Sequence, residues 1–158
     1  MASGKVNFND FIKLRDKLQR LNDEAKRQEF LESCAKELAA RLLAKVKKRT
    51  PVGDYSGASY TCESGHTHKG AKVPGKVGGT LRRRWAIEPI RKEGDKYIIE
   101  IINPVEYAPY VEYGHRTRGG KGWVEGHFMM TISENEIRDM APSILEKKLR
   151  RQLGDLLK

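Results

Sequence analysis

A cysteine and two histidines, all residue types that bind metals, lie close together in the segment CESGHTH. They are Cys62, His66 and His68, at spacings of four and two residues, and Cys34 could complete a set of four ligands. The spacing matches none of the familiar zinc motifs, and the segment is glycine-rich. We therefore expect no metal and no cofactor, and keep these residues only as weak metal candidates.

Positive charge is concentrated in one part of the sequence. The chain carries 31 Lys and Arg against 21 Asp and Glu, and residues 66–92 hold eight of the basic residues with one acid, so this region supplies +7 of the formal +10. Such charge suits contact with a phosphate backbone or an acidic protein. We predict this contact for Lys69, Lys72, Lys76, Arg82, Arg83, Arg84, Arg116 and Arg118. The alternative is a solvated face, with Trp85 packed inward rather than stacked on nucleic acid.

No motif for catalysis stands out. The sequence has no glycine-rich phosphate loop after a strand, and it contains neither G-x-S-x-G nor H-E-x-x-H. Glu112 and Glu125 are single carboxylates among aromatics, and His115 and His127 have no Ser or Cys nucleophile beside them. We expect a protein that is not an enzyme, and a hydrolase with dispersed residues stays open because an active site need not be contiguous.

The stretch YAPYVEYGHRTRGGKGW, residues 107–123, joins an aromatic half to a glycine-rich, basic half. Aromatic side chains are enriched both in cores and in subunit interfaces. We favour core packing for Tyr107, Tyr110 and Tyr113 and keep a subunit interface as the alternative. The glycines that follow allow tight turns that expose the basic residues between them.

The size and composition indicate one domain. A chain of 158 residues is of ordinary single-domain length. No apolar run is long enough to span a membrane, and the first ten residues have no apolar signal-peptide core, so we expect a cytosolic start and no membrane partner. Two cysteines form no disulfide framework, and we expect both to be thiols.

Helices are predicted at both ends of the chain. Apolar residues recur at helical spacing over residues 8–49, and Asn22-Asp23 offers an N-cap, which favours a short helix from about Asn9 and a longer one to about Lys48. Helical spacing returns at Phe128 or Met129 and continues towards the C-terminus. Pro142 should kink or divide that last helix.

A long loop and a hairpin are predicted between the helices. Residues 51–79 are rich in glycine and small polar residues, which is typical of a mobile loop. Two apolar runs flank the turn signal Glu93–Lys96. The second run, Tyr97–Ile102, should form a central, covered strand, and Pro89 places the first run at an edge.

The expected fold is therefore α+β, with N-terminal helices and a C-terminal helix packed on a small antiparallel sheet and a long basic Gly-rich loop. We treat residues 1–158 as a single domain. Its parts are helices at 8–49, a loop insertion at 50–79, a sheet at 80–126 and a C-terminal helical region at 127–158.

Three stretches together resemble a family of bacteriophage tail components, the gene product ten family of tailed phages and prophages. Pro51-Val52-Gly53-Asp54 and Gly79-Thr80-Leu81-Arg82-Arg83 are similar to the two halves of its P-V-D-T-G-x-L-R-x-S motif. Tyr107 to Gly114 matches its Y-A-x-Y-V-E-F/Y-G motif, and His127-Phe128-Met129 resembles the opening of its last helix, with histidine in place of the usual proline. About 24 residues, 55–78, are inserted within the first motif.

This resemblance implies a structural virion protein of the neck or tail terminus, present in the host cytoplasm during assembly and acting in head-tail joining or tail completion. It implies a homo-oligomeric ring that contacts neighbouring connector, tail terminator or tail tube proteins and, without sequence preference, genomic DNA in its channel. The implied oligomer or partner interface is Tyr107, Tyr110, Val111, Glu112, Tyr113, Gly114 and Phe128. The alternative functions are a nonspecific nucleic-acid-binding protein and, behind it, a small metal-dependent enzyme.

Overall fold

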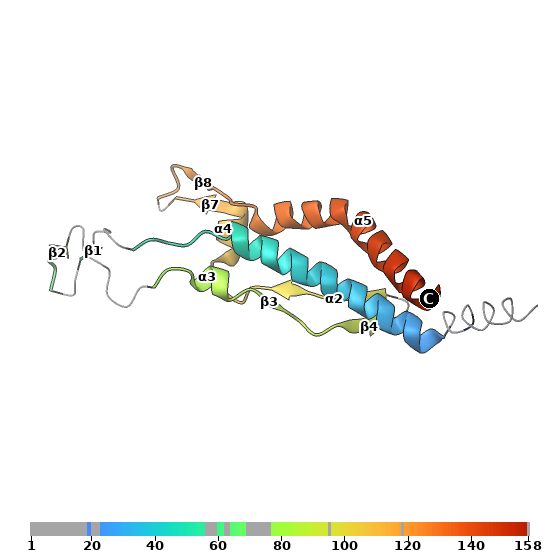
Figure 1. The fold of residues 1–158 in the computed structure, drawn as a ribbon. Coiled ribbons are helices and arrows are strands. Elements are labelled where there is room, and N and C mark those ends of the chain that lie inside the picture. The colour runs from blue at the N-terminus through green and yellow to red at the C-terminus, as the bar shows by residue number, and fades with distance from the viewer. Residues whose placement is uncertain are drawn as a thin grey trace, which may run out of the picture.

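The computed structural model describes residues 19, 23–55, 60–61, 64–68, 77–94, 96–117 and 119–157, except the side chains at positions 60, 68 and 155–157. The first predicted helix, from about Asn9, lies outside this part except for residue 19, and the predicted loop of residues 50–79 is described only in part. The α+β class is confirmed (Figure 1). The elements are α2 (Glu24–Arg49), β1 (Tyr60–Thr61), β2 (Thr67–His68), α3 (Thr80–Arg83), β3 (Ala86–Ile87), β4 (Arg91–Glu93), β5 (Lys96–Ile98), β6 (Ile101–Ile102), α4 (Ala108–Tyr113), β7 (Gly114–Arg116), β8 (Trp123–Glu125) and α5 (Met129–Leu157).

Two long helices, α2 and α5, form the body of the fold. The Asp23 side chain accepts a hydrogen bond from the Ala25 amide at 3.0 Å and caps α2, as the sequence predicted. The helix ends at Arg49, two residues before Pro51. Pro142 lies inside α5, which stays one helix and bends where its colour passes from orange to red in Figure 1.

Charged side chains join α2 to α5 at two levels. Glu136 of α5 accepts hydrogen bonds from Lys45 at 2.6 Å and from Arg49. Lys148, which lies 12 residues beyond Glu136 on α5, reaches back to the Glu37 carboxylate at 3.1 Å and the Ser33 carbonyl at 2.8 Å. These ion pairs are partly shielded from water, so we expect them to fix how the two helices align more than to stabilise the fold.

The Glu136 cluster should make stability depend on pH. The hydrogen bond from Lys45, and then the positive charges of Arg49 and Lys45, lower the pKa of Glu136 below its ordinary value of 4.5. A lowered folded-state pKa contributes stability above the ordinary value and loses it as the pH falls through the folded-state pKa. We expect Glu136→Gln to reduce the fall in stability between pH 6 and pH 3, measured by urea unfolding, and Glu134→Gln, which removes an exposed pair with Arg138, to leave that fall nearly unchanged. Parallel curves for the wild type and Glu136→Gln would contradict this prediction.

The middle of the chain forms the predicted antiparallel hairpin, interrupted by a bulge. β4 pairs with β5 around the turn at Gly94, and β3 pairs with β6. The register shifts by one residue between the two ladders, so Pro89 and Ile90 stand opposite Ile99. Proline has no amide hydrogen to give to a ladder, which explains why the irregularity falls there.

The prediction of a central, covered strand at Tyr97–Ile102 was wrong. Among the described residues, β5 and β6 each pair with a single strand, and Ile102 is 38% exposed. Within the described residues, α2 is the helix that packs against this hairpin, at β3 and β5. The apolar run had suggested burial on both faces, which a two-stranded ladder beside one helix does not provide.

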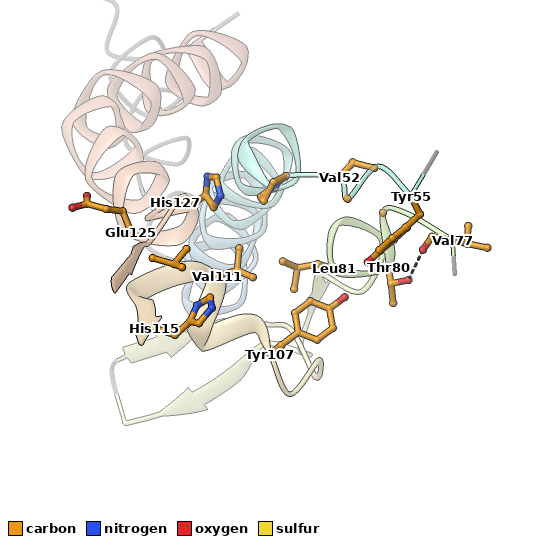
Figure 2. Close-up of a pocket in the computed structure, with 14 residues that line it drawn as sticks. Val52, Tyr55, Val77, Thr80, Leu81, Tyr107, Val111, His115, Glu125 and His127 are labelled. Carbon is orange, nitrogen blue, oxygen red and sulfur yellow. Dashed lines mark hydrogen bonds between the residues drawn. The ribbon is translucent and has the colours of Figure 1, made fainter. Parts of the chain in front are cut away.

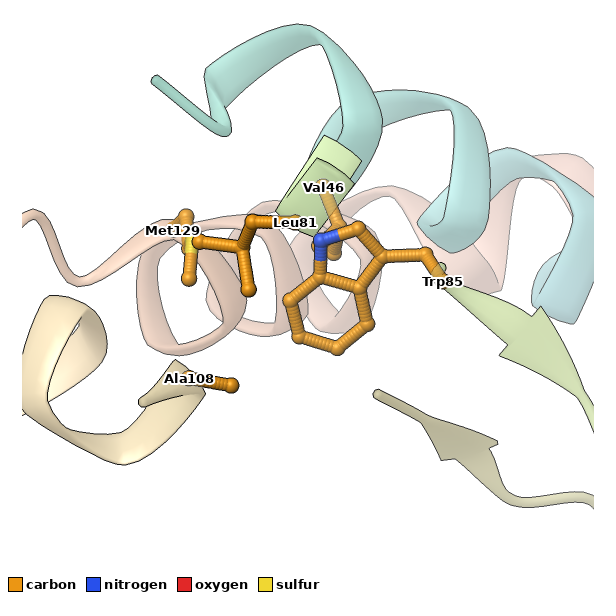
Figure 3. Packing of buried hydrophobic residues seen from close by; sticks show 5 residues of the cluster. All are labelled: Val46, Leu81, Trp85, Ala108 and Met129. Carbon is orange, nitrogen blue, oxygen red and sulfur yellow. The ribbon is translucent and has the colours of Figure 1, made fainter. Parts of the chain in front are cut away.

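The core lies where α2, α3, α4 and the start of α5 meet (Figure 3). Its buried side chains are Val46, Leu81, Trp85, Ala108 and Met129. The buried Thr50 links two of these elements, because its hydroxyl donates to the Val46 carbonyl at 2.7 Å and accepts from the Trp85 indole at 2.8 Å. Trp85 is 7% exposed, so it packs inward and does not offer a stacking face for nucleic acid.

Candidate functional site

The helix α4 divides the YAPYVEYG segment into an inner and an outer face. Ala108 and Glu112, four residues apart, are buried. Tyr107, Tyr110 and Tyr113 recur every three residues and are 46%, 58% and 63% exposed. The core packing that we favoured for these tyrosines was therefore wrong, because the helical period turns all three away from the core.

The Glu112 side chain of α4 caps the N-terminus of the last helix, α5. Its carboxylate accepts hydrogen bonds from the Met130 amide, the Thr131 amide and the Thr131 hydroxyl, at 2.9, 2.9 and 2.8 Å. The first turn of α5 holds no acidic residue of its own. A carboxylate at this position satisfies amides that the helix leaves unpaired and complements the positive end of its dipole. The buried Glu112 thus fixes α4 against α5 within one chain.

Two glycines allow the backbone on either side of this cap to come together. A Cβ at Gly114 would lie 2.4 Å from the Val124 carbonyl oxygen, and its φ of +87° also favours glycine. A Cβ at Gly126 would lie 2.2 Å from the Glu112 carbonyl oxygen. The β7–β8 hairpin is therefore held directly against the end of α4.

An open hollow of about 300 Å³ lies beside α4 (Figure 2). One side comes from residues 51–55 and 77–81 and includes Val52, Tyr55 and Val77. The other side includes Tyr107, Val111 and His115. Figure 2 shows Glu125 pointing away from it. The two sides are the bases of the 55–78 insertion and the aromatic motif, so the hollow brings together the stretches on which the family resemblance depends.

Two further exposed apolar residues, which we did not predict, lie on β8, the strand that pairs with β7 at the end of α4. Trp123 and Val124 of β8 are 58% and 43% exposed, and Phe128 is 40% exposed. A tryptophan among glycines and charged residues was the available signal in the sequence. We call Tyr107, Tyr110, Tyr113, Trp123 and Phe128 the aromatic surface.

The predicted basic contacts separate into three groups. Lys69, Lys72, Lys76 and Arg118 lie outside the described residues. Arg82 donates twice to the Thr50 carbonyl, at 3.0 and 2.6 Å, and Arg83 donates to the Gly78 carbonyl at 3.0 Å. These two guanidinium groups donate to the chain itself although both residues are exposed, and Arg84 and Arg116 are exposed as well.

The candidate metal residues are not brought together in the described part of the chain. Cys62 and the His68 side chain lie outside it, and the exposed His66 ring lies 3.3 Å from the Ser64 hydroxyl. Among the described residues, no group of three or more His, Cys, Asp or Glu could hold a metal. Cys34 is a free thiol, and burial raises its pKa.

Comparison with known protein families gives a match. The model described as "Bacteriophage HK97-gp10, putative tail-component" matches residues 12–114, about two thirds of the chain. Comparisons with curated proteins and with solved structures give no match. Within the described residues, no helix combines the length and the apolar character that crossing a bilayer requires.

Proposed function

Because the chain belongs to the HK97 gp10-like family of bacteriophage tail components, we propose that it is a structural protein of the neck or tail end that serves head-tail joining or tail completion. Family membership supports a structural rather than an enzymatic role and a place in the virion. Joining two preformed parts of a particle requires a protein that presents a defined surface to a partner. The aromatic surface is the observation that carries this proposal.

The aromatic surface has the composition and the rigidity of a protein interface. Tyrosine and tryptophan are enriched among the residues that contribute most to binding, since they bury a large area with few rotatable bonds. The Glu112 cap and the close backbone contact at Gly126 hold this surface on α4 and β7–β8. A preformed surface loses little entropy on binding, which favours assembly.

We propose that the aromatic surface joins each subunit to the next in a ring. Identical subunits that meet through two different patches close into a ring when the rotation between them allows it. Of the interface residues predicted from the sequence, Glu112 and Gly114 act by shaping the surface, and Tyr107, Tyr110, Tyr113 and Phe128 supply exposed area. Connector, tail terminator or tail tube proteins would then bind the faces of the ring.

We propose that basic residues contact DNA in the channel or an acidic face of an adjacent ring. They are the exposed Arg84 and Arg116, and Lys69, Lys72 and Lys76 of the insertion. Such a channel must admit DNA of any sequence, and positive charge attracts the phosphate backbone without base-specific contacts. Nonspecific nucleic-acid binding as the main role is the second candidate, favoured by the concentration of charge in residues 66–92.

Removing two tyrosines should prevent joining while leaving the subunit folded. Tyr110→Ala with Tyr113→Ala removes exposed rings, so we expect a thermal midpoint within about 2 °C of the wild type, since exposed substitutions cost little. In a phage or prophage that lacks this gene, the variant should leave DNA-filled heads beside unattached tails, seen by electron microscopy. The control is Leu31→Ala with Leu149→Ala, which removes exposed apolar groups from α2 and α5. Normal particles from the tyrosine variant would refute the role of this surface.

A further inference from the structure

The two long helices leave a second hollow between them, away from the aromatic surface. It is open, has a volume of about 500 Å³, and lies along the part of α5 that follows the bend in Figure 1. Its lining residues come from α2 and α5 alone: Glu37, Arg41, Met140, Ser143, Ile144, Lys147, Lys148 and Arg151. We call it the α2–α5 groove. None of these residues belongs to the basic loop that the sequence singled out.

Cations outnumber acids in the α2–α5 groove by four to one. The single acid, Glu37, is already paired with Arg41 at 2.8 Å and Lys148 at 3.1 Å, and these two hydrogen bonds lower its pKa. Lys147 and Arg151 stand four residues apart on one face of α5, and neither forms an ion pair with any described residue. Two exposed positive charges that form no ion pair within the described residues therefore belong to a lining with a net positive charge.

We propose that the α2–α5 groove binds the phosphate backbone of double-stranded nucleic acid. Long Lys and Arg side chains supply donors for phosphate oxygens, and the Ser143 hydroxyl adds another at the same place. Among the described residues, the lining contains no aromatic side chain on which unpaired bases could stack. This composition favours a duplex over a single strand and predicts binding without sequence preference.

This inference does not depend on the ring or on the aromatic surface. The groove lies within one chain, so an isolated subunit should bind the duplex. An acidic protein would need shape and apolar complementarity in addition to charge, and the groove offers only Met140 and Ile144 as apolar lining. The phosphate backbone, which presents regularly spaced negative charge, fits the observed cations better.

Binding of a fluorescently labelled 20-base-pair duplex to the full-length protein, followed by anisotropy between 50 and 200 mM salt, tests the proposal. Lys147→Gln with Arg151→Gln should weaken binding by at least about tenfold at 100 mM salt. It should also lower the steepness of log affinity against log salt by about 2, because each lost phosphate contact lowers that steepness by about 1. The control is Lys92→Gln with Lys96→Gln, the same change in charge on the exposed β4–β5 hairpin. It should weaken binding by less than about threefold.

Three results would overturn the proposal. The first is equal loss in both double variants, which would mean that net charge alone attracts the duplex. The second is unchanged binding in Lys147→Gln with Arg151→Gln, with loss instead on replacing Arg84 and Arg116. The third is a single strand of equal length, or poly-glutamate, that binds the wild type more tightly than the duplex does. Circular dichroism melting of each variant would show that a loss of binding is not a loss of folding.

Discussion

Gly126→Ala is expected to destabilise the protein by about 3 kcal/mol, at the upper end of what overpacking costs. The added Cβ would lie 2.2 Å from the Glu112 carbonyl oxygen and 2.6 Å from the Tyr113 carbonyl carbon. Both are backbone atoms, so no side chain can rotate out of the way. The same backbone is held by hydrogen bonds from the His127 amide to the Val111 carbonyl, 2.8 Å, and from the Phe128 amide to the Glu112 carbonyl, 3.0 Å.

The measurement for Gly126→Ala is thermal unfolding, where the expected fall in the midpoint is about 10 °C for a chain of this size. Gly154→Ala is the matched control. Gly154 lies inside α5 with open space where its Cβ would be, so the same substitution should raise stability by about 0.5–1 kcal/mol. Opposite signs for the two variants support a steric requirement at Gly126, and a neutral Gly126→Ala would show that β8 moves away freely.

Features set by neighbouring residues were predictable from the sequence. The cap at Asp23, the end of α2 before Pro51 and the turn at Gly94 all depend on residues within a few positions of one another. The interruption of the hairpin at Pro89 depends only on a missing amide hydrogen. Such local rules gave the two long helices, the hairpin and the α+β class, but not the short helices α3 and α4.

The direction of a side chain was harder to predict, because partners far apart in the sequence decide it. Glu112 and the Met130 amide that donates to it are 18 residues apart in the sequence. Arg82 and the Thr50 carbonyl that accepts from it are 32 residues apart. The family resemblance implied an interface role for Glu112, and the local concentration of charge suggested a contact with DNA or an acidic partner for Arg82. In the folded chain the Glu112 carboxylate caps a helix, and the Arg82 guanidinium holds the carbonyl at the end of another.

The tyrosine face could have been predicted from one further step of reasoning. Tyr107, Tyr110 and Tyr113 recur every three residues, so a helix through them must place all three on roughly one side. Ala108 and Glu112 occupy the other side, and only one side can face the core. No helix was predicted for YAPYVEYG, yet proline in the first turn is compatible with a helix.

Glu112→Ala is expected to cost about 2–3 kcal/mol, because three hydrogen bonds to a charged acceptor are lost in a partly buried place. The Met130 and Thr131 amides would face the cavity left by the carboxylate, so the first turn of α5 should fray. Hydrogen exchange of these two amides should rise well before exchange in the middle of α5. Urea unfolding gives the change in stability.

Glu112→Gln separates hydrogen bonding from charge. The amide oxygen can still accept from one or both amides, whereas the negative charge that complements the helix dipole is gone, so the expected cost is about 1 kcal/mol. Glu106→Ala, a truncation of an exposed carboxylate just before α4, should be nearly neutral. If Glu112→Ala were as mild as Glu106→Ala, the cap would not hold α4 against α5. The aromatic surface would then need another source of rigidity, and the case for a preformed interface would weaken with it.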